Sequence, residues 1–268
     1  MDIFKHLKDN KEALIAEKKF RVKEADAIVY TPTATTIKVS SVKSEDENEV
    51  ETKLDSIKVK VVINTTNILD SHGDVHIKGI WNKSLKEQKN LYLLQEHQMT
   101  FSKIITDELT ASVKTMSWSE LGFDKLEGDT QALIFEAKVS SKRNEFMFEQ
   151  YAKGYVKEHS VGMRYVNMYL CINSEEKYYR EEKDNWDKYI VEVSNKEDAI
   201  AQGYFWAVTE AKIIEGSAVV KGSNYATPTL SVKENIEAVN NTSKNEPSTD
   251  TQDKSESIYY LTNNLKLT

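Results

Sequence analysis

Short apolar runs of strand length dominate residues 57–231, and this pattern constrains the fold more than any other feature. The first run, Ile57 to Ile63, alternates apolar and polar side chains and then becomes fully apolar, as in a strand that enters a core. Further strands are predicted at 102–106, 111–118, 131–139, 159–170, 188–193 and 206–220. We therefore expect an α+β fold, with a compact β-barrel-like core and a few flanking helices.

The helices are predicted between these strands. Residues 81–96 should form a helix that delivers His97 at its C-terminal side, and residues 141–157 a helix that ends near Gly154. The segment 173–187 is dense in Glu, Lys and Tyr, and it is predicted to be a solvent-exposed insertion between two strands.

The sequence divides into three parts, namely 1–56, 57–230 and 231–268. In the first part, residues 2–19 have the spacing of a short amphipathic helix, which either packs on the main domain or docks on a partner. An extended stretch at 29–41 and an acidic linker at 44–49 complete this arm.

The third part is predicted to be a largely disordered tail. Apart from Pro247, residues 240–257 carry no apolar side chain, so burial cannot offset the entropy of ordering them. The short apolar segment 258–261 that follows is either a docking peptide or a frayed end.

Composition restricts the setting in which the protein works. No apolar run approaches the length of about 18 residues that crosses a bilayer, and the N-terminus does not read as a signal peptide. The single cysteine, Cys171, cannot form an internal disulfide and suits a reducing cytoplasm. A net charge of −7 without a basic stripe argues against general nucleic-acid binding. We therefore expect a cytoplasmic protein that binds neither membrane nor nucleic acid, with no cofactor.

The segment 157–163, together with Gln95-Glu96-His97 upstream, carries the parts of a serine hydrolase. Ser160 lies beside Gly162 at the start of a predicted strand, and a serine hydroxyl needs a neutral imidazole to take its proton. Of the five histidines, His6 lies in the arm, and His159 should point to the opposite face of the strand from Ser160. The residues alone leave three candidate bases: His72, His76 and His97.

Four blocks in this order resemble the prohead (head maturation) proteases of tailed bacteriophages, relatives of the herpesvirus assemblins. They are Ile68–Asp74 with Lys78–Trp81, Gln95–His97, Ser160–Gly162, and Ile214–Val220 with Ser223–Ala226. The resemblance covers about residues 57–228. The chain departs from the family's pattern at His159 and Met163, which flank the Ser-Val-Gly motif, and at Ser223–Ala226, where the family commonly has Pro-Ala-Asn.

This resemblance implies a catalytic Ser160, with His97 as its base and Glu215 as the group that orients His97. Glu210 is the second choice for that third position. No histidine follows Ser160, so the second-histidine triad of the herpesvirus enzymes is excluded.

The implied activity is that of a serine endopeptidase. Its substrates would be the scaffolding protein and the major capsid protein inside an assembling procapsid in the host cytoplasm. Self-association and self-cleavage are also implied. We expect the tail beyond Ser231, and also the arm before Ile57, to be removed by self-processing, because polar, cleavable segments flank a self-contained core.

Two other functions fit parts of the sequence. His72, Asp74 and His76 would share one face of an extended segment and could form a metal-binding hydrolase site, completed by His97 or Glu96. Alternatively, this stretch is a glycine turn in which Asp70 and Asp74 bond to local backbone and the histidines are exposed. The other function is a non-catalytic scaffold or structural component of a phage head.

Overall fold

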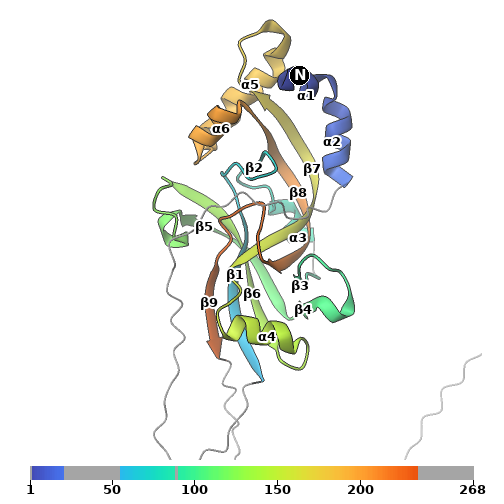
Figure 1. The fold of residues 1–268 in the computed structure, drawn as a ribbon, viewed down its shortest axis with the longest axis vertical. Helices are drawn as coiled ribbons and strands as arrows, with labels where there is room; N and C mark the ends of the chain where they lie inside the picture. The colour runs from blue at the N-terminus through green and yellow to red at the C-terminus, as the bar shows by residue number, and fades with distance from the viewer. Residues whose placement is uncertain (1, 21–54, 88–89, 235–268) are drawn as a thin grey trace, which may run out of the picture. The chain divides into compact units, whose positions relative to one another are not determined.

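The computed structural model describes residues 2–20, 55–87 and 90–234, which form two β-sheets with helices packed against them (Figure 1). The predictions for 29–41, 44–49, 240–257 and 258–261 lie outside these residues. None of the described helices is long and apolar enough to span a membrane.

The first sheet has four antiparallel strands in the order β5-β6-β1-β9. They are β5 (Leu109–Ser117), β6 (Asp129–Ser140), β1 (Ser56–Thr65) and β9 (Thr229–Glu234). Strand β1 is central, and its later residues are buried on both faces. Val61 and Ile63 belong to the largest apolar cluster, whereas Val62 packs in a separate cluster on the opposite face. Burial on both faces explains why the run becomes fully apolar.

The second sheet is built around one long strand, β8 (Tyr204–Val219), which pairs along its length with antiparallel β7 (Glu158–Ile172). On its other edge, β8 pairs in parallel with β2 (Asp74–His76) and β3 (Leu93–Gln95), and β3 in turn pairs with β4 (Ile104–Thr106). This sheet therefore brings three segments far apart in sequence onto one strand.

The two sheets touch at Gly216. A Cβ placed there would lie 2.7 Å from Cε2 of Phe135 on β6 and 2.9 Å from Cδ1 of Ile63 on β1. Only a glycine allows β8 to approach the first sheet this closely.

The expected α+β class is therefore correct, but the expected barrel-like core is wrong. The described strands form two open sheets, because β8 crosses the first sheet at Gly216 rather than joining its edge.

The helices are shorter than predicted. The predicted helix 81–96 is correct in its first part, where α3 spans Asn82–Glu87, and wrong at its end, where Leu93–Gln95 is β3. Leu93 and Leu94 are fully buried, and their pairing with β8 outweighs local helix preference. Helix α4 (Glu145–Ala152) lies within the predicted range 141–157, with Gly154 at a φ of 69° two residues beyond its end.

Segment 173–187 is not a simple exposed insertion. It contains a 3₁₀ turn at Lys177–Tyr179 and most of α5 (Arg180–Tyr189), which packs on β7 through the buried Trp186 and Tyr189. The predicted strand 188–193 is likewise wrong, because α5 runs into a 3₁₀ turn at Ile190–Glu192. The predicted strand 102–106 is half correct: Phe101–Lys103 is a 3₁₀ turn and 104–106 is β4. Helix α6 (Lys196–Gln202) then leads into β8.

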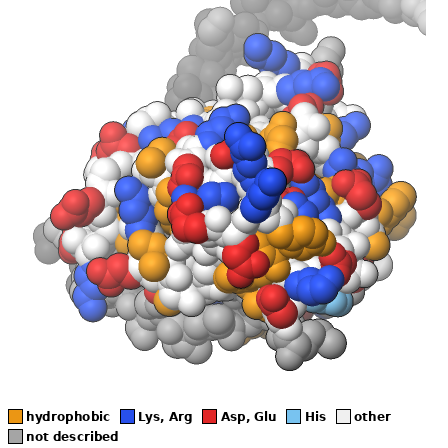
Figure 2. Space-filling model, turned by 90° about the horizontal axis from the view of Figure 1, so that it is seen from above, with side chains coloured by type: hydrophobic (Ala, Val, Ile, Leu, Met, Phe, Trp, Pro, Cys, Tyr) orange, Lys and Arg blue, Asp and Glu red, His pale blue; other side chains and the backbone are white. Residues whose placement is uncertain are grey.

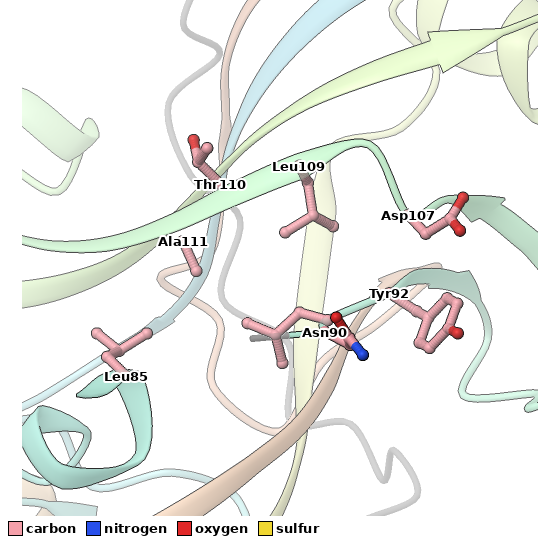
Figure 3. A pocket seen from close by; sticks show the side chains of 8 residues that line it. Leu85, Asn90, Tyr92, Asp107, Leu109, Thr110 and Ala111 are labelled. Atoms are coloured by element: carbon pink, nitrogen blue, oxygen red, sulfur yellow. The ribbon is translucent and has the colours of Figure 1, made fainter. Parts of the chain in front are cut away.

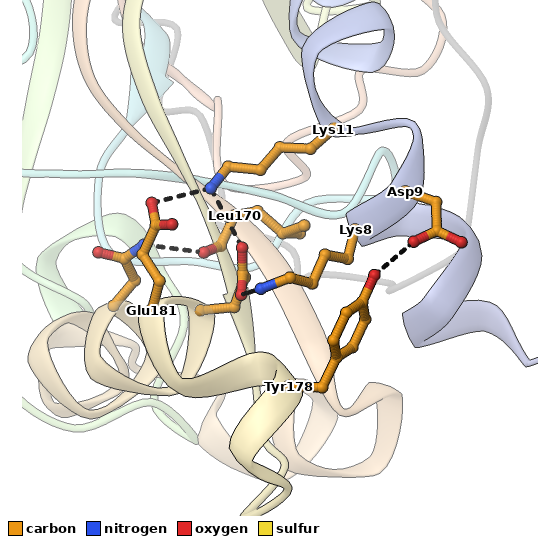
Figure 4. A network of polar contacts seen from close by, with 8 residues as sticks. Lys8, Asp9, Lys11, Leu170, Tyr178 and Glu181 are labelled. Atoms are coloured by element: carbon orange, nitrogen blue, oxygen red, sulfur yellow. Dashed lines mark hydrogen bonds and ion pairs between the residues drawn. The ribbon is translucent and has the colours of Figure 1, made fainter.

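Residues 2–20 of the N-terminal arm pack on the domain as two helices, α1 (Ile3–Asp9) and α2 (Lys11–Phe20). Lys8 and Lys11 reach Glu182 of α5 at 2.6 and 3.1 Å, and the Glu182 side chain is only 1% exposed (Figure 4). Lys11 also pairs with Glu181 at 2.9 Å, and Lys18 lies 2.7 Å from the fully buried Asp74. A buried carboxylate is costly unless paired, so the arm supplies counter-charges that the domain needs.

Figure 2 shows one face of the molecule, on which Lys and Arg side chains are interspersed with Asp and Glu around hydrophobic side chains. This face presents no continuous field of a single sign.

Candidate active site

The turn after β3 presents His97. Glu96 and His97 have φ values of 52° and 56°, a left-handed conformation that is uncommon for residues other than glycine. Two hydrogen bonds to β8 hold the turn: Glu96 N–H donates to the Ala218 carbonyl at 3.0 Å, and His97 N–H to Ser217 Oγ at 3.1 Å. Strained backbone of this kind persists only where surrounding contacts impose it.

The imidazole of His97 meets a buried carboxylate. Nδ1 lies 2.6 Å from Oε1 of Glu215, and the two side chains are only 8% and 2% exposed. Because a carboxylate accepts and does not donate, Nδ1 carries the proton in this contact, and in the neutral imidazole the lone pair lies on Nε2. Nε2 is buried and has no hydrogen-bond partner among the described residues.

Ser160 lies on the same face of the sheet as Glu215. In the pairing of β7 with β8, Ser160 is opposite Ser217 and Gly162 is opposite Glu215. Paired residues and residues two apart on a strand point to one face, so all four lie together on it. Val161, which points to the other face, belongs to the main apolar cluster.

The Ser160 hydroxyl is not bonded to His97. Ser160 is 8% exposed, and its hydroxyl forms no hydrogen bond with any residue that the structure describes. The structure thus joins His97 to Glu215 and brings Ser160 to their face of the sheet, without a contact between Oγ and Nε2.

Gly162 has a spatial role at this candidate site that the sequence did not reveal. A Cβ at this position would lie 1.9 Å from Oε1 of Glu215, the oxygen that contacts His97. The glycine therefore clears the space in which the carboxylate lies. The signal was present in the Ser-Val-Gly motif, but it becomes interpretable only when β7 and β8 are in register.

The second-choice acid, Glu210, is excluded from this site. It lies on β8 five residues before Glu215, about 16 Å along the strand. Its carboxylate contacts Lys83 at 3.1 Å and the Asn167 amide at 2.7 Å.

The proposed metal ligands are engaged elsewhere. Asp74 accepts from Lys18 at 2.7 Å and from the Tyr165 hydroxyl at 2.8 Å. The ring of His76 lies between the Tyr165 hydroxyl at 3.1 Å and the Asn64 amide at 3.2 Å. Across residues 2–20, 55–87 and 90–234, no three His, Cys, Asp or Glu side chains are arranged to hold a metal ion.

The glycine-turn interpretation of this stretch is correct for Asp70, whose Oδ1 accepts from the backbone N–H groups of His72 and Asp74 at 2.9 Å each. It is incomplete for Asp74, whose carboxylate bonds to side chains of α2 and β7. Its expectation of exposed histidines is wrong for His76, which is only 1% exposed.

His159 points away from Ser160, as predicted, and is fully buried. Its Nδ1 lies 3.1 Å from the Thr227 carbonyl, which can only accept, so Nδ1 donates and Nε2 accepts from the Tyr151 hydroxyl at 3.0 Å. Burial lowers the pKa of His159 from 6.5 to about 4.

This buried histidine predicts a loss of stability in acid. The unfolded chain takes up a proton at His159 below about pH 6.5, whereas the folded protein resists it until about pH 4. Stability from this residue is therefore complete above pH 6.5 and falls as the pH drops towards 4, by about 3 kcal/mol in all. Urea unfolding at several pH values, compared with that of His159→Gln, measures it. Equal slopes with pH in the two proteins would contradict the assignment.

A cavity lies beside this site rather than in it. It has a volume of about 520 Å³ and lies between α3, the segment 90–92 and the start of β5 (Figure 3). Tyr92 lines it, and the Tyr92 carbonyl accepts from the N–H of Gly216, the neighbour of Glu215. Neither His97, Ser160 nor Glu215 lines this cavity.

Comparison with known proteins adds no relative: no family model, no curated protein and no solved structure matches the chain.

Proposed function

We propose that this chain is a serine endopeptidase that uses Ser160, His97 and Glu215. One observation carries the proposal: the 2.6 Å contact between His97 Nδ1 and Glu215, on the sheet face that also bears Ser160. An acid inside a buried strand is costly unless it is paired, and here its partner is the histidine.

In the proposed reaction, Ser160 Oγ attacks the carbonyl carbon of a peptide bond and His97 Nε2 takes the hydroxyl proton. Glu215 holds the imidazole with Nε2 unprotonated and stabilises the imidazolium that forms. His97 then delivers the proton to the leaving amine, and water hydrolyses the acyl-enzyme by the reverse sequence. The reaction requires Oγ and Nε2 to approach within hydrogen-bond distance, a contact that often tightens only when substrate binds.

The four sequence blocks support a place in the prohead protease family, with an assemblin-like fold. They converge on one sheet: the first leads into β2, the second follows β3, the third begins β7 and the fourth lies in and after β8. On this basis the proposed substrates are the scaffolding protein and the major capsid protein inside an assembling procapsid, and the enzyme associates with itself.

Self-processing of the tail is part of the same proposal, but the cleavage position proposed from the structure differs from the one predicted from the sequence. Strand β9 continues to Glu234 and pairs with β1, with Glu234 opposite Ile57. A cut directly after Ser231 would fall inside this strand, where an extended and paired backbone resists proteolysis. We therefore propose cleavage beyond Glu234. Removal of the arm remains a prediction. It would break the ion pairs that Lys8, Lys11 and Lys18 form with the domain.

Intact-mass spectrometry on the concentrated protein tests the proposal. The wild-type chain is expected to shorten on incubation, and Ser160→Ala is expected to stay full length. Ser112→Ala, at an exposed position on β5, should shorten like the wild type. If all three remain intact, the test is repeated with capsid and scaffold proteins, and continued inactivity would favour a non-catalytic scaffold. Equal shortening in all three would exclude Ser160 as the nucleophile.

A further inference from the structure

Three hydrogen bonds join His97, Ser217 and Glu215 in a closed ring. His97 N–H donates to Ser217 Oγ at 3.1 Å, and the Ser217 hydroxyl donates to Glu215 Oε2 at 2.6 Å. The ring closes between Glu215 Oε1 and His97 Nδ1, also at 2.6 Å. Ser217 thus bonds both to the backbone of the histidine and to the carboxylate that holds its ring.

Ser217 fixes the orientation of the Glu215 carboxylate. The two oxygens of Glu215 have different partners, since Oε1 contacts the imidazole and Oε2 the hydroxyl. A second donor prevents the carboxylate from turning about its last bond, and charge-assisted hydrogen bonds of this length are the strong ones. Gly162 leaves the space that this orientation needs.

On the histidine side, Ser217 fixes the backbone. His97 and Glu96 both have positive φ values, so the turn requires outside contacts to persist. The Ser217 hydroxyl accepts the N–H of His97 itself, while the Ala218 carbonyl accepts that of Glu96. Ser217 therefore holds the backbone of His97, and Glu215, which Ser217 also contacts, holds the imidazole ring.

We propose that Ser217 is a positioning residue that sets the direction of His97 Nε2 towards Ser160. The proposal rests on the proposed peptidase function. Ser217 is fully buried and lies opposite Ser160 across the β7–β8 pair, and its hydroxyl bonds to the His97 backbone and to the Glu215 carboxylate. A buried serine that merely stabilised the strand would affect folding without affecting the rate of cleavage.

The kinetic test uses a peptide that spans the self-cleavage site mapped by mass spectrometry. Ser217→Ala is expected to lower kcat about 10- to 100-fold and to leave KM within about twofold, because it removes a hydrogen bond to a charged group and no contact with substrate. Ser217→Thr, which keeps the hydroxyl, is expected to recover most of kcat. Unchanged kcat in Ser217→Ala, with only a lower free energy of unfolding, would overturn the proposal.

A second measurement separates this inference from the peptidase proposal. In protein carrying Ser160→Ala and ¹⁵N-labelled histidine, the carboxylate-bonded Hδ1 of His97 should give a downfield NMR signal, assigned by its loss in His97→Gln. Adding Ser217→Ala is expected to weaken or shift this signal. An unchanged signal would overturn the positioning role, whether or not the wild type cleaves peptides. Conversely, an inactive wild type with a Ser217-dependent signal would sink the peptidase function and leave the positioning of His97 standing.

Discussion

Replacement of Glu215 by glutamine is expected to slow cleavage by about four orders of magnitude while the chain stays folded. The carboxylate accepts from both His97 Nδ1 and the Ser217 hydroxyl. The amide of glutamine can accept from only one of them, so with its carbonyl towards Ser217 it presents its NH2 group to His97 Nδ1. The imidazole is then more stable with its proton on Nε2 than on Nδ1. In that tautomer Nε2 cannot accept the proton of Ser160.

The rate of self-cleavage, followed by intact mass, measures this effect, with circular dichroism to show that the fold persists. Glu210→Gln is the matched control: the same change on the same strand, at an acid that contacts Lys83 and Asn167. It should leave the rate within about twofold, since exposed ion pairs contribute little. A fall of less than tenfold in Glu215→Gln would show that the carboxylate does not govern the histidine.

Gly162→Ala is expected to abolish detectable cleavage and to lower the free energy of unfolding by about 1–3 kcal/mol. The added methyl group would lie 1.9 Å from Oε1 of Glu215 and 2.7 Å from its Cδ. The carboxylate must therefore leave its place, which breaks the contact with His97 and leaves a buried charge without its donors.

A double-mutant cycle makes this prediction specific. Glu215→Asp removes one methylene, so the shorter side chain relieves the contact with the added methyl group but cannot reach His97. In the Gly162→Ala background, it should restore part of the stability and none of the activity. Additive losses of stability in the two single variants would show that the positions do not compete for the same space.

Local patterns predicted the central strands, whereas segments governed by distant contacts were misread. Strands β1, β6, β7 and β8 lie close to the predicted ranges, because their apolar runs are long and flanked by turns. Leu93–Gln95 was assigned to a helix, because three residues carry too little periodicity to reveal pairing with a strand more than 120 residues later. The same limit applies to 188–193, where the apolar residues of a helix end and a 3₁₀ turn look like a strand.

The candidate site was predictable in part. The motifs singled out His97, Ser160 and Glu215, and the contact expected between His97 and Glu215 is present. Sequence could not show why Gly162 is a glycine or what Ser217 touches, since both depend on the register of β7 against β8. It also gave no sign that the arm neutralises Glu182, 171 residues away from Lys11.

The central position of β8 fixes when, during synthesis, the site can exist. His97 and Ser160 are both translated before Glu215. Ser160 is positioned by the pairing of β7 with β8, and His97 by a turn that is hydrogen-bonded to β8. The first sheet is completed later still, because β9, the last described strand, pairs with β1, which is among the first strands to be translated. A ribosome-bound chain that has not reached residue 219 has not yet assembled the nucleophile and base that we propose for self-cleavage. The order of the gene thereby delays any self-cleavage until the folded region is nearly complete.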